Sequence, residues 1–349
     1  MFALELRNLI DTMRAQVFTP VGEARLLPTL AQLEAAAALV HAGMPPTPQY
    51  CWPLLCQRAG AEVWVKHENH TPVGAFKVRG GLVYMRELKR QQPDIAGVIA
   101  ATRGNHGQSV AFAARRAGLP AVIVVPHGNS VEKNAAMRAL GAELIEHGHD
   151  FQAAYEYAMG LAAARKLHAL RSFHPWLVTG VGSYALELFR AVPAIDTVYV
   201  PIGLGSGICG TIAARDALGL TTKVVGVVAE NAPAYALSLA KKSAVSTNSA
   251  DTIADGMACR VPDNDALGII FKGADRIVTV SEDEIKAAMG HYFRDTHNVA
   301  EGAGAAPLAA LIKERERMIG KRAGLILSGG NVDRIVFARV PLETSNHPA

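Results

Sequence analysis

Lys77 stands in a segment whose composition could make its side-chain amine a nucleophile. Small and apolar residues flank it, namely Gly74-Ala75-Phe76 before it and Val78 after it. An amine that is taken out of water loses part of its preference for the ammonium form. A neutral lysine amine can attack a carbonyl group and form a Schiff base. Because a single lysine is most often a solvated surface residue, further motifs must decide between the two interpretations.

Two glycine-containing segments could bind anions. The first is Thr102-Arg103-Gly104-Asn105-His106-Gly107, and the second is Gly203-Leu204-Gly205-Ser206-Gly207. Each follows an apolar run and precedes a helical pattern, so its backbone N–H groups would lie at a helix N-terminus. Free N–H groups and the helix dipole at such a position attract a carboxylate or a phosphate. An ordinary strand-to-helix turn without a ligand is the alternative for both segments.

The second segment also matches the GxGxxG pattern of dinucleotide-binding turns, as Gly205-Ser206-Gly207-Ile208-Cys209-Gly210. Glu230 lies twenty residues beyond Gly210, which is typical of the acidic residue that binds a ribose. An NAD-dependent oxidoreductase is therefore one hypothesis. A helix N-terminus binds a monophosphate ester as well as a pyrophosphate, so the pattern alone does not select a ligand. The NAD hypothesis also leaves Lys77 and Ser328 without a role.

Short apolar runs alternate with longer Ala-rich stretches along most of the chain. Continuous apolar strands separated by helices predict parallel sheets that are covered on both faces. The predicted strands are 95–102, 121–126, 197–202, 223–228 and 324–327, and the predicted helices include 108–117, 130–140 and 211–218. Ser281 and Glu284 form a capping-box pattern at the start of a further helix. The polar stretch 241–252 is predicted to be a surface loop, and the fold class is α/β.

Glu68-Asn69 and the run Gly74-Ala75-Phe76-Lys77-Val78-Arg79-Gly80-Gly81 resemble a motif of fold-type II pyridoxal 5′-phosphate (PLP) enzymes. The group that they resemble comprises the threonine/serine dehydratases (threonine ammonia-lyases) and the serine racemases. The typical form is Glu-Asn-x-x-x-x-Gly-Ser-Phe-Lys-x-Arg-Gly-Ala. In this chain Ala75 replaces the serine and Gly81 replaces the final alanine.

The resemblance extends from about Thr47 to Asp333, with four motifs in the family order. It implies a PLP cofactor, and two domains that each hold a mostly parallel, open twisted sheet flanked by helices, as in the tryptophan synthase β-like fold. It also implies that Lys77 is the Schiff-base lysine and the base at Cα. The residues that the resemblance assigns to the cofactor are Phe76, Lys77, Asn105, Gly203, Leu204, Gly205, Ser206, Gly207, Gly256, Glu301 and Ser328.

The segment Ser328-Gly329-Gly330-Asn331 bears on the type of reaction. By resemblance, Ser328 binds the pyridine nitrogen of PLP, and Asn105 binds its 3-oxygen. A neutral hydroxyl does not force the pyridine nitrogen to be protonated, so the ring is a weaker electron sink than it is beside an acid. Such a ring suffices when the charge that forms at Cα is discharged at once by loss of a β-leaving group. The resemblance therefore favours β-elimination.

By resemblance, the substrate carboxylate binds to Thr102, Arg103, Gly104, Asn105 and His106. Serine racemases have a second serine at the position of Arg103, where it is the acid and base on the opposite face of Cα. A guanidinium stays protonated near neutral pH and is a poor proton shuttle. Racemisation is therefore disfavoured, and we assign Arg103 to anion binding.

A second departure lies at Thr179-Gly180-Val181-Gly182-Ser183, where typical dehydratases carry a Gly-Gln-Gly-Thr run. Trp176 precedes this segment. It is either a core residue or one wall of a substrate pocket, and in the second case the substrate would be larger than serine or threonine.

The resemblance implies an enzyme that converts a threonine- or serine-like β-hydroxy amino acid to a 2-oxo acid and ammonia by α,β-elimination. One alternative is a dehydratase for a larger substrate of the phenylserine or 3-hydroxyaspartate type. An amino-acid racemase is another. A non-catalytic PLP-binding sensor is the third, for which Ala75, Arg103 and Ala236 would be signs of erosion.

The predicted organisation is a large PLP-binding domain formed by residues 1–96 and 171–349, with residues 1–27 as an N-terminal arm. Residues 97–170 form a smaller domain inserted into it. The cofactor is expected in the cleft between the domains, at the carboxyl ends of the strands.

The bulk properties limit the partners. The 349 residues are 50% hydrophobic with a formal net charge of +4, and no dense basic run with interleaved aromatic residues predicts nucleic-acid binding. The four cysteines show no metal-binding spacing. No apolar stretch approaches the ~20 residues needed to span a membrane. We therefore expect a cytoplasmic protein without nucleic-acid or membrane partners. The partners expected together with the family resemblance are a small amino-acid substrate and a second copy of the chain in a homodimer. Glu230 resembles one ligand of a cation site in some relatives, but Ala236 stands where an Asp would complete it, so no metal is predicted.

Overall fold

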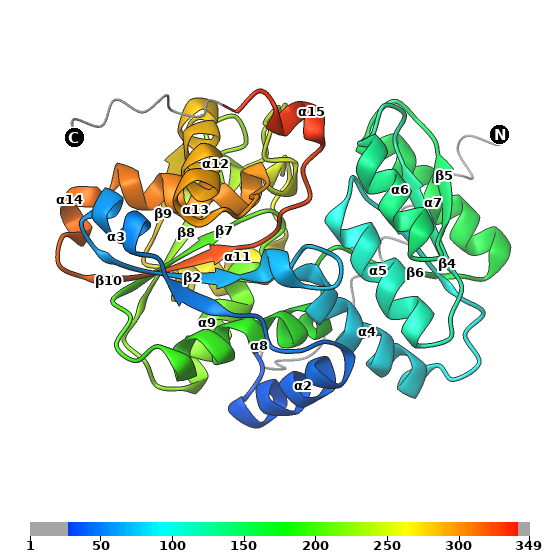
Figure 1. Cartoon of the computed structure of the whole chain (residues 1–349). Helices are drawn as coiled ribbons and strands as arrows, with labels where there is room; N and C mark the ends of the chain where they lie inside the picture. The colour runs from blue at the N-terminus through cyan, green and yellow to red at the C-terminus, as the bar shows by residue number, and fades with distance from the viewer. Residues whose placement is uncertain (1–26, 341–349) are drawn as a thin grey trace.

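The computed structural model describes residues 27–340, which fold around two separate sheets (Figure 1). The larger sheet has six strands in the spatial order β1 (Gln49–Cys51), β2 (Glu62–His67), β10 (Arg322–Leu327), β7 (Thr197–Pro201), β8 (Lys223–Ala229) and β9 (Arg276–Val280). The edge strand β1 runs antiparallel to β2, and the other pairings are parallel. The predicted N-terminal arm lies outside the described residues, apart from Leu27.

The smaller sheet has the order β5 (Glu143–Glu146), β4 (Ala121–Val125), β3 (Val98–Ala101) and β6 (His168–Ala169), and all its strands are parallel. Helices α5 (Asn105–Arg116), α6 (Val131–Ala139) and α7 (Phe151–Arg165) surround it (Figure 1). The predicted α/β class with mostly parallel sheets is confirmed. The strands lie within the range predicted for the small domain, whose boundaries stay a prediction.

Helices cover both faces of the large sheet. One face packs against α8 (Pro175–Ala191), α9 (Ser206–Ala217) and α11 (Asn264–Gly273), and the other against α3 (Pro53–Ala59), α12 (Glu282–Thr296) and α13 (Gly302–Lys313). Successive side chains of a strand point to opposite faces. Accordingly Tyr199 of β7 belongs to one core, whereas Val198 and Val200 belong to the other. This double burial explains the unbroken apolar runs in the sequence.

Helix α4 (Lys77–Gln91) joins the two units. Its residues Val78 and Leu82 share a buried cluster with Val98 of β3, and α2 (Leu30–Gly43) contributes to the same cluster. On its other side α4 crosses α8 so closely that a Cβ on Gly180 would lie 2.4 Å from the carbonyl oxygen of Arg79. The elements that complete the fold are α10 (Ala234–Lys241), α14 (Arg315–Met318), α15 (Arg334–Phe337) and the short 3₁₀ helices η1 (Glu68–His70) and η2 (Asp255–Met257).

Two predicted helices begin earlier than expected. Helix α5 begins at Asn105 and not at residue 108, and α9 begins at Ser206 and not at residue 211. In both cases the apolar periodicity starts only after a glycine-rich first turn, so the pattern misses that turn. The capping box is confirmed, since Glu284 N donates to Ser281 Oγ over 3.2 Å and Ser281 N donates to Glu284 Oε2 over 2.7 Å. Residues 243–252 contain no helix or strand, as the loop prediction required.

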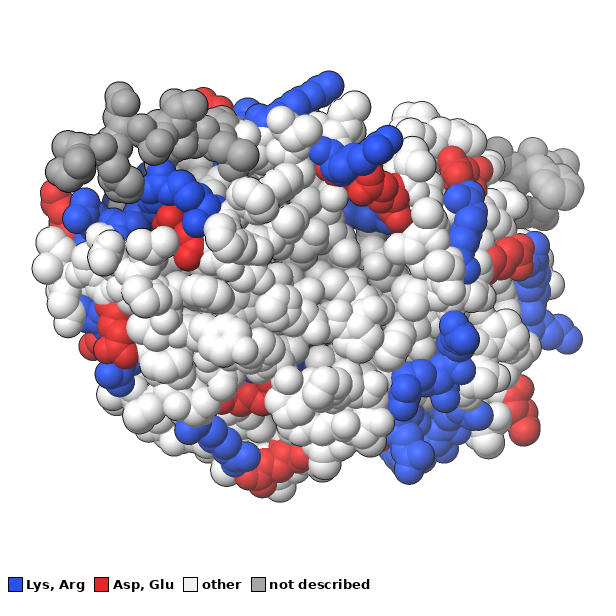
Figure 2. Space-filling view, viewed as in Figure 1, with Lys and Arg blue, Asp and Glu red and all other residues white. Residues whose placement is uncertain are grey.

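The face drawn in Figure 2 has few charges at its centre and a basic group over the C-terminal ends of α4 and α5. The last turns of these helices carry Lys89, Arg90, Arg115 and Arg116, and cations at that end offset the helix dipoles. Within residues 27–340, every helix is too short or too polar to traverse a bilayer.

Candidate active site

The segments that follow β2, β7 and β10 converge at the carboxyl edge of the large sheet. They border a cavity of about 350 Å³, its mouth included, and clefts at this edge of an open parallel sheet are where such folds bind ligands. The lining residues are Phe76, Lys77, Asn105, Pro201, Gly203, Leu204, Gly205, Ser206, Gly207, Gly256, Glu301, Ala303 and Ser328. The structure thus brings together every residue that the sequence assigned to the cofactor. Their individual roles stay predictions.

Backbone hydrogen bonds hold Lys77 beside the end of β10. Phe76 N donates to the carbonyl oxygen of Ser328 over 2.9 Å, and Ala75 forms an isolated antiparallel bridge with Gly329. The hydroxyl of Thr71 accepts from Ala75 N over 2.9 Å and donates to Ala75 O over 2.8 Å. Lys77 is therefore fixed relative to Ser328, although 250 residues separate the two segments in the chain.

The amine of Lys77 has no polar partner. Its Nζ lies 4.6 Å from the centroid of the Phe76 ring, and it makes no hydrogen bond or ion pair with any residue between 27 and 340. Burial lowers the pKa of Lys77 below its ordinary value, although Glu301 and Asp255 act in the opposite direction. The side chain is thus a desolvated amine at the wall of a cavity, as a Schiff-base lysine must be.

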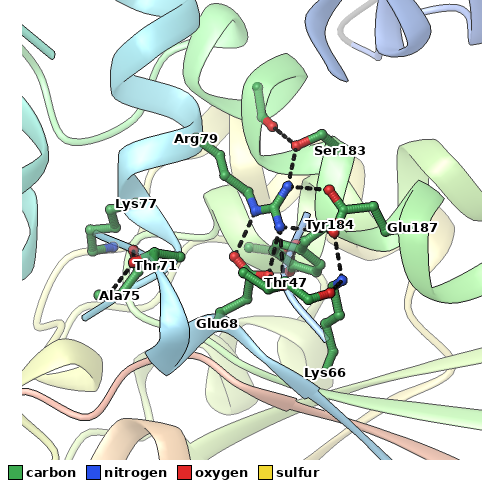
Figure 3. Close-up of polar contacts among 12 residues, drawn as sticks. Thr47, Lys66, Glu68, Thr71, Ala75, Lys77, Arg79, Ser183, Tyr184 and Glu187 are labelled. Carbon is green, nitrogen blue, oxygen red and sulfur yellow. Dashed lines mark hydrogen bonds and ion pairs between the residues drawn. The ribbon is translucent and has the colours of Figure 1, made fainter. Parts of the chain in front are cut away.

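Arg79, two residues after Lys77, is fully buried and anchors the start of α4 (Figure 3). Its Nε donates to Glu68 Oε2 over 2.7 Å, and its Nη1 donates to Glu187 Oε1 over 2.6 Å. Lys66 donates to the other oxygen of Glu187. Two cations and two carboxylates therefore neutralise one another beneath the cavity. Because a buried charge is costly unless it is paired, this network fixes α4 against β2 and α8.

The loop 203–207 is shaped by glycine. A Cβ on Gly203 would lie 2.2 Å from the carbonyl oxygen of Gly256, and Gly205 adopts a φ of +100° in the left-handed region. Ser206 and Gly207 then form the first turn of α9, whose N–H groups lack intrahelical acceptors. The loop therefore presents bare backbone donors and the positive end of a helix dipole to the cavity, and a phosphate group fits such a site.

Asn105 connects the small unit to a buried carboxylate of the large one. Its Nδ2 donates to Glu301 Oε1 over 2.6 Å, and its Oδ1 accepts from Asn331 Nδ2 over 2.9 Å. The other oxygen of Glu301 has no hydrogen-bond partner in the described part of the chain. Burial and the nearby Asp255 raise the pKa of Glu301 to about 7, although Lys133, Asn105 and Lys77 oppose the rise.

Lys133 of α6 is a site residue that the sequence reasoning missed. It is buried, its Nζ donates to Asp255 Oδ2, and it lies 3.7 Å from Glu301 Oε2. Burial alone would lower the pKa of Lys133, but Glu301 and Asp255 raise it above its ordinary value. One signal was available: α6 begins just after β4, at the same sheet edge as the segment 102–106.

The predicted substrate segment lies at the end of β3. Thr102 Oγ1 accepts from Gly104 N over 3.1 Å. His106 is buried with an unpaired Nε2, and burial together with Lys77 lowers its pKa to about 3. Arg103 is exposed and forms no ion pair within residues 27–340. The other residues of the segment are buried, so Arg103 alone of the five reaches solvent.

Trp176 is half-buried, packs against the core and does not line the cavity of Lys77. Its ring meets those of Tyr84 and His174 edge-on, at centroid distances of 5.2 and 4.6 Å, and it packs against the cluster that α4 shares with the small sheet. Glu230 is exposed. Residues 27–340 contain no group of three or more His, Cys, Asp or Glu side chains arranged to hold a metal ion.

The groups around the cavity fit PLP. The partly buried Lys77 amine, which is unpaired within residues 27–340, suits its aldehyde. The free N–H groups of the glycine loop suit its phosphate, and the buried Ser328 hydroxyl is a neutral partner for its ring nitrogen. A dinucleotide would leave the Lys77 amine without a function. The donor set therefore matches a phosphorylated aldehyde better than it matches NAD.

Comparisons with known proteins agree with this donor set. Residues 40–329 match the family described as "Pyridoxal-phosphate dependent enzyme". An L-threonine ammonia-lyase of Thermotoga maritima is 34% identical over 291 residues, which cover 82% of this chain and 71% of that protein. An L-threo-3-hydroxyaspartate ammonia-lyase of Saccharomyces cerevisiae is 31% identical and covers 90% of this chain and 96% of its own length.

The solved structure of a maize serine racemase superposes with a TM-score of 0.85 at 25% identity, over 90% of this chain and 96% of the maize chain. The match at 40–329 extends over both sheets and over every residue that lines the cavity. This chain therefore belongs to the pyridoxal-phosphate dependent enzyme family, and PLP is its cofactor.

Proposed function

We propose that the protein is a PLP-dependent ammonia-lyase that converts a β-hydroxy amino acid, with threonine and serine as the reference substrates, to a 2-oxo acid and ammonia. The observation that carries the proposal is the desolvated amine of Lys77, unpaired within residues 27–340, in one cavity with the neutral hydroxyl of Ser328. The names of the relatives from Thermotoga maritima and Saccharomyces cerevisiae support the same reaction class.

When bound, PLP supplies an electrophilic carbonyl and a ring that withdraws electrons from the substrate Cα. Lys77 would hold the cofactor and take the proton from Cα, because its burial favours the neutral amine. The N–H groups of the 203–207 loop would hold the phosphate, and those of the 102–106 segment would hold the substrate carboxylate. Over the whole reaction the β-hydroxyl leaves as water and one water is taken up again, so the net products are a 2-oxo acid and ammonium.

The racemase alternative needs a second proton donor on the other face of Cα. At the position where the racemase motif has a serine, this chain has Arg103, which is exposed and retains its proton. The relation to the maize racemase therefore supports the fold and the cofactor more than it supports racemisation. We propose elimination as the main reaction and expect no appreciable D-amino acid.

The test combines cofactor chemistry with product analysis. The purified protein should be yellow, and borohydride should fix the cofactor covalently to Lys77, as peptide mass spectrometry can show. Lys77→Ala should abolish both fixation and turnover while the circular dichroism spectrum is retained. A colourless protein that binds NAD would overturn the cofactor assignment. The absence of 2-oxo acid from L-serine, both threonine diastereomers, 3-hydroxyaspartate and phenylserine would favour the sensor alternative.

We further propose a cytoplasmic homodimer. Exposed apolar side chains at β1, α3, α12 and α15 support self-association, namely Tyr50, Leu54, Phe293, Ile335 and Val336. Light scattering of the holoenzyme tests the dimer, and cell fractionation tests the compartment. A monomer at micromolar concentration, or recovery with membranes, would contradict the respective expectation.

A further inference from the structure

A second cavity, of about 660 Å³ with its mouth, adjoins the one that holds the cofactor residues. Leu204 lines both cavities. Ala101 also lines the second cavity and directly precedes the predicted substrate segment at Thr102. The second cavity therefore lies next to the predicted substrate segment and next to the 203–207 loop.

Three aromatic side chains stand in the walls of this second cavity, beside the polar residues Gln152, Arg171, Ser172 and Asp263. Phe151 and Tyr155 project from the first turns of α7, with ring centroids 6.3 Å apart and planes 26° apart. Phe173 faces the same space from the loop after β6. Leu170, Ala101 and Leu204 add apolar surface, so aliphatic and aromatic groups dominate the lining.

The charges in this cavity are already balanced. Its only cation is Arg171 and its only carboxylate is Asp263, and the two are paired over 3.4 Å. Asp263 is held in place because its Oδ1 caps α11 by accepting from Asp265 N and Ala266 N. The pair leaves no uncompensated positive charge for an anionic group that entered the cavity.

Two hydrogen bonds of Tyr235 fix Leu204 relative to Asp263. The hydroxyl of Tyr235 donates to Leu204 O over 3.0 Å and accepts from Asp263 N over 3.1 Å. Leu204 and Asp263 are therefore held by one buried phenol, which fixes the wall that the two cavities share. A preorganised apolar pocket binds a matching group without the cost of ordering its own side chains.

We propose that the second cavity receives the β-substituent of the substrate, and that the enzyme acts best on β-hydroxy amino acids whose β-carbon carries an aromatic ring. The inference rests on the proposed function and names its substrate class. The hydrogen or methyl group of serine or threonine would leave the aromatic walls in contact with water. The second carboxylate of 3-hydroxyaspartate would enter a pocket whose single cation is already neutralised. An uncharged ring gains the burial that the walls offer.

The first experiment compares kcat/KM for L-threonine, L-serine, phenylserine and 3-hydroxyaspartate on the holoenzyme. Burial of a phenyl group predicts a preference for phenylserine over threonine of about 10- to 100-fold. Equal or higher kcat/KM for threonine, or a preference for 3-hydroxyaspartate, would overturn the inference.

The second experiment fills the cavity. Ser172→Phe adds a ring from the half-buried Ser172 of the lining, and should lower the phenylserine-to-threonine ratio of kcat/KM at least tenfold. Ser249→Phe places the same ring in the exposed loop after α10. It should leave kcat/KM for phenylserine and for threonine unchanged. Tyr155→Ala removes one aromatic wall without adding bulk, and should also lower the phenylserine-to-threonine ratio of kcat/KM. This variant keeps the test available if Ser172→Phe fails to fold. An unmoved ratio in Tyr155→Ala would contradict the inference.

A binding measurement separates failure of the pocket from failure of the proposed function. L-Phenylalanine has a ring but no β-hydroxyl, so it can bind but cannot undergo elimination. It should bind the holoenzyme at least tenfold more tightly than L-alanine does, by calorimetry, and Ser172→Phe should remove that difference. Tight binding of phenylalanine, together with no 2-oxo acid from any of the β-hydroxy amino acids, would contradict the proposed function alone. Turnover of the β-hydroxy amino acids, together with equal binding of L-phenylalanine and L-alanine, would contradict the aromatic pocket alone.

Discussion

Nδ2 of Asn105 lies 2.6 Å from Oε1 of Glu301, so one hydrogen bond joins the first turn of α5 to the N-cap of α13. The two helices belong to different units of the fold. The carboxylate that receives this bond is buried, and the ammonium group of Lys133 lies 3.7 Å from its other oxygen. The ionisation of Glu301 and the contact between the two units are therefore linked.

The first prediction concerns the pH dependence of stability. Burial raises the pKa of Glu301 to about 7, whereas an unfolded glutamate titrates near about 4.3. Between these values the folded protein binds more protons than the unfolded chain, so this group lowers stability as pH rises. Relative to Glu301→Gln, the wild type should lose at most about 3 kcal/mol across this window. Urea denaturation of the cofactor-free wild type and of Glu301→Gln at pH 5 and pH 8 measures this loss. If the free energy of unfolding changes equally with pH in the two proteins, Glu301 is an ordinary carboxylate.

The second prediction concerns Lys133. Its ammonium group favours the ionised form of Glu301, so Lys133→Met should move the titration of Glu301 to higher pH by about 1 unit. The pH dependence of cofactor absorbance in the holoenzyme reports this change. Lys133→Arg keeps the charge and should restore most of the wild-type profile. If the cofactor absorbance of Lys133→Met and of the wild type depends on pH in the same way, the role of Lys133 is only to hold the two units together.

The third prediction tests the network under α4. Arg79→Met leaves Glu68 and Glu187 without their shared guanidinium, and loss of one partner from a buried ion pair costs about 3–5 kcal/mol. Arg90→Met is the matched control, because Arg90 pairs with Glu87 on the surface and such pairs contribute at most about 1 kcal/mol. Equilibrium unfolding of the cofactor-free proteins gives both values. Equal losses in the two variants would mean that the buried network adds nothing specific.

The fourth prediction concerns Arg103. It has no protein partner to lose within residues 27–340 and is exposed beside the predicted carboxylate segment. Arg103→Ala should therefore leave the thermal midpoint unchanged and raise KM about tenfold with a smaller effect on kcat, the loss expected for one charge-assisted hydrogen bond. Steady-state kinetics with the preferred substrate measures it. An unchanged KM would show that Arg103 faces solvent in the complex as well.

The turn motifs could be predicted from the sequence because their chemistry is local. Gly205 reflects a left-handed backbone conformation within one short segment, and Lys77 stands beside residues that desolvate it. Gly203 could be recognised only as part of the same motif, because the carbonyl oxygen that its Cβ would meet belongs to the distant Gly256. Glu187 could not be foreseen, since its pairing with Arg79 arises only when α4 crosses α8. Lys133 escaped notice for the same reason, because its partners Asp255 and Glu301 come from the other unit. The first turn of α9 was missed since helical periodicity begins only after the glycines.

The pairing of β2 with β10 also affects how the chain is made. By the time residue 177 has been synthesised, every segment of the core shared by α2, α4 and the small sheet exists, so that part can fold while the ribosome is still at work. The large sheet has only β1 and β2 at that stage. One edge of β2, which carries Val63 and Val65, must remain unpaired until β10 has been synthesised. While the residues between β2 and β10 are being made, the nascent chain therefore presents an apolar strand that a chaperone can bind, and the cofactor site stays incomplete.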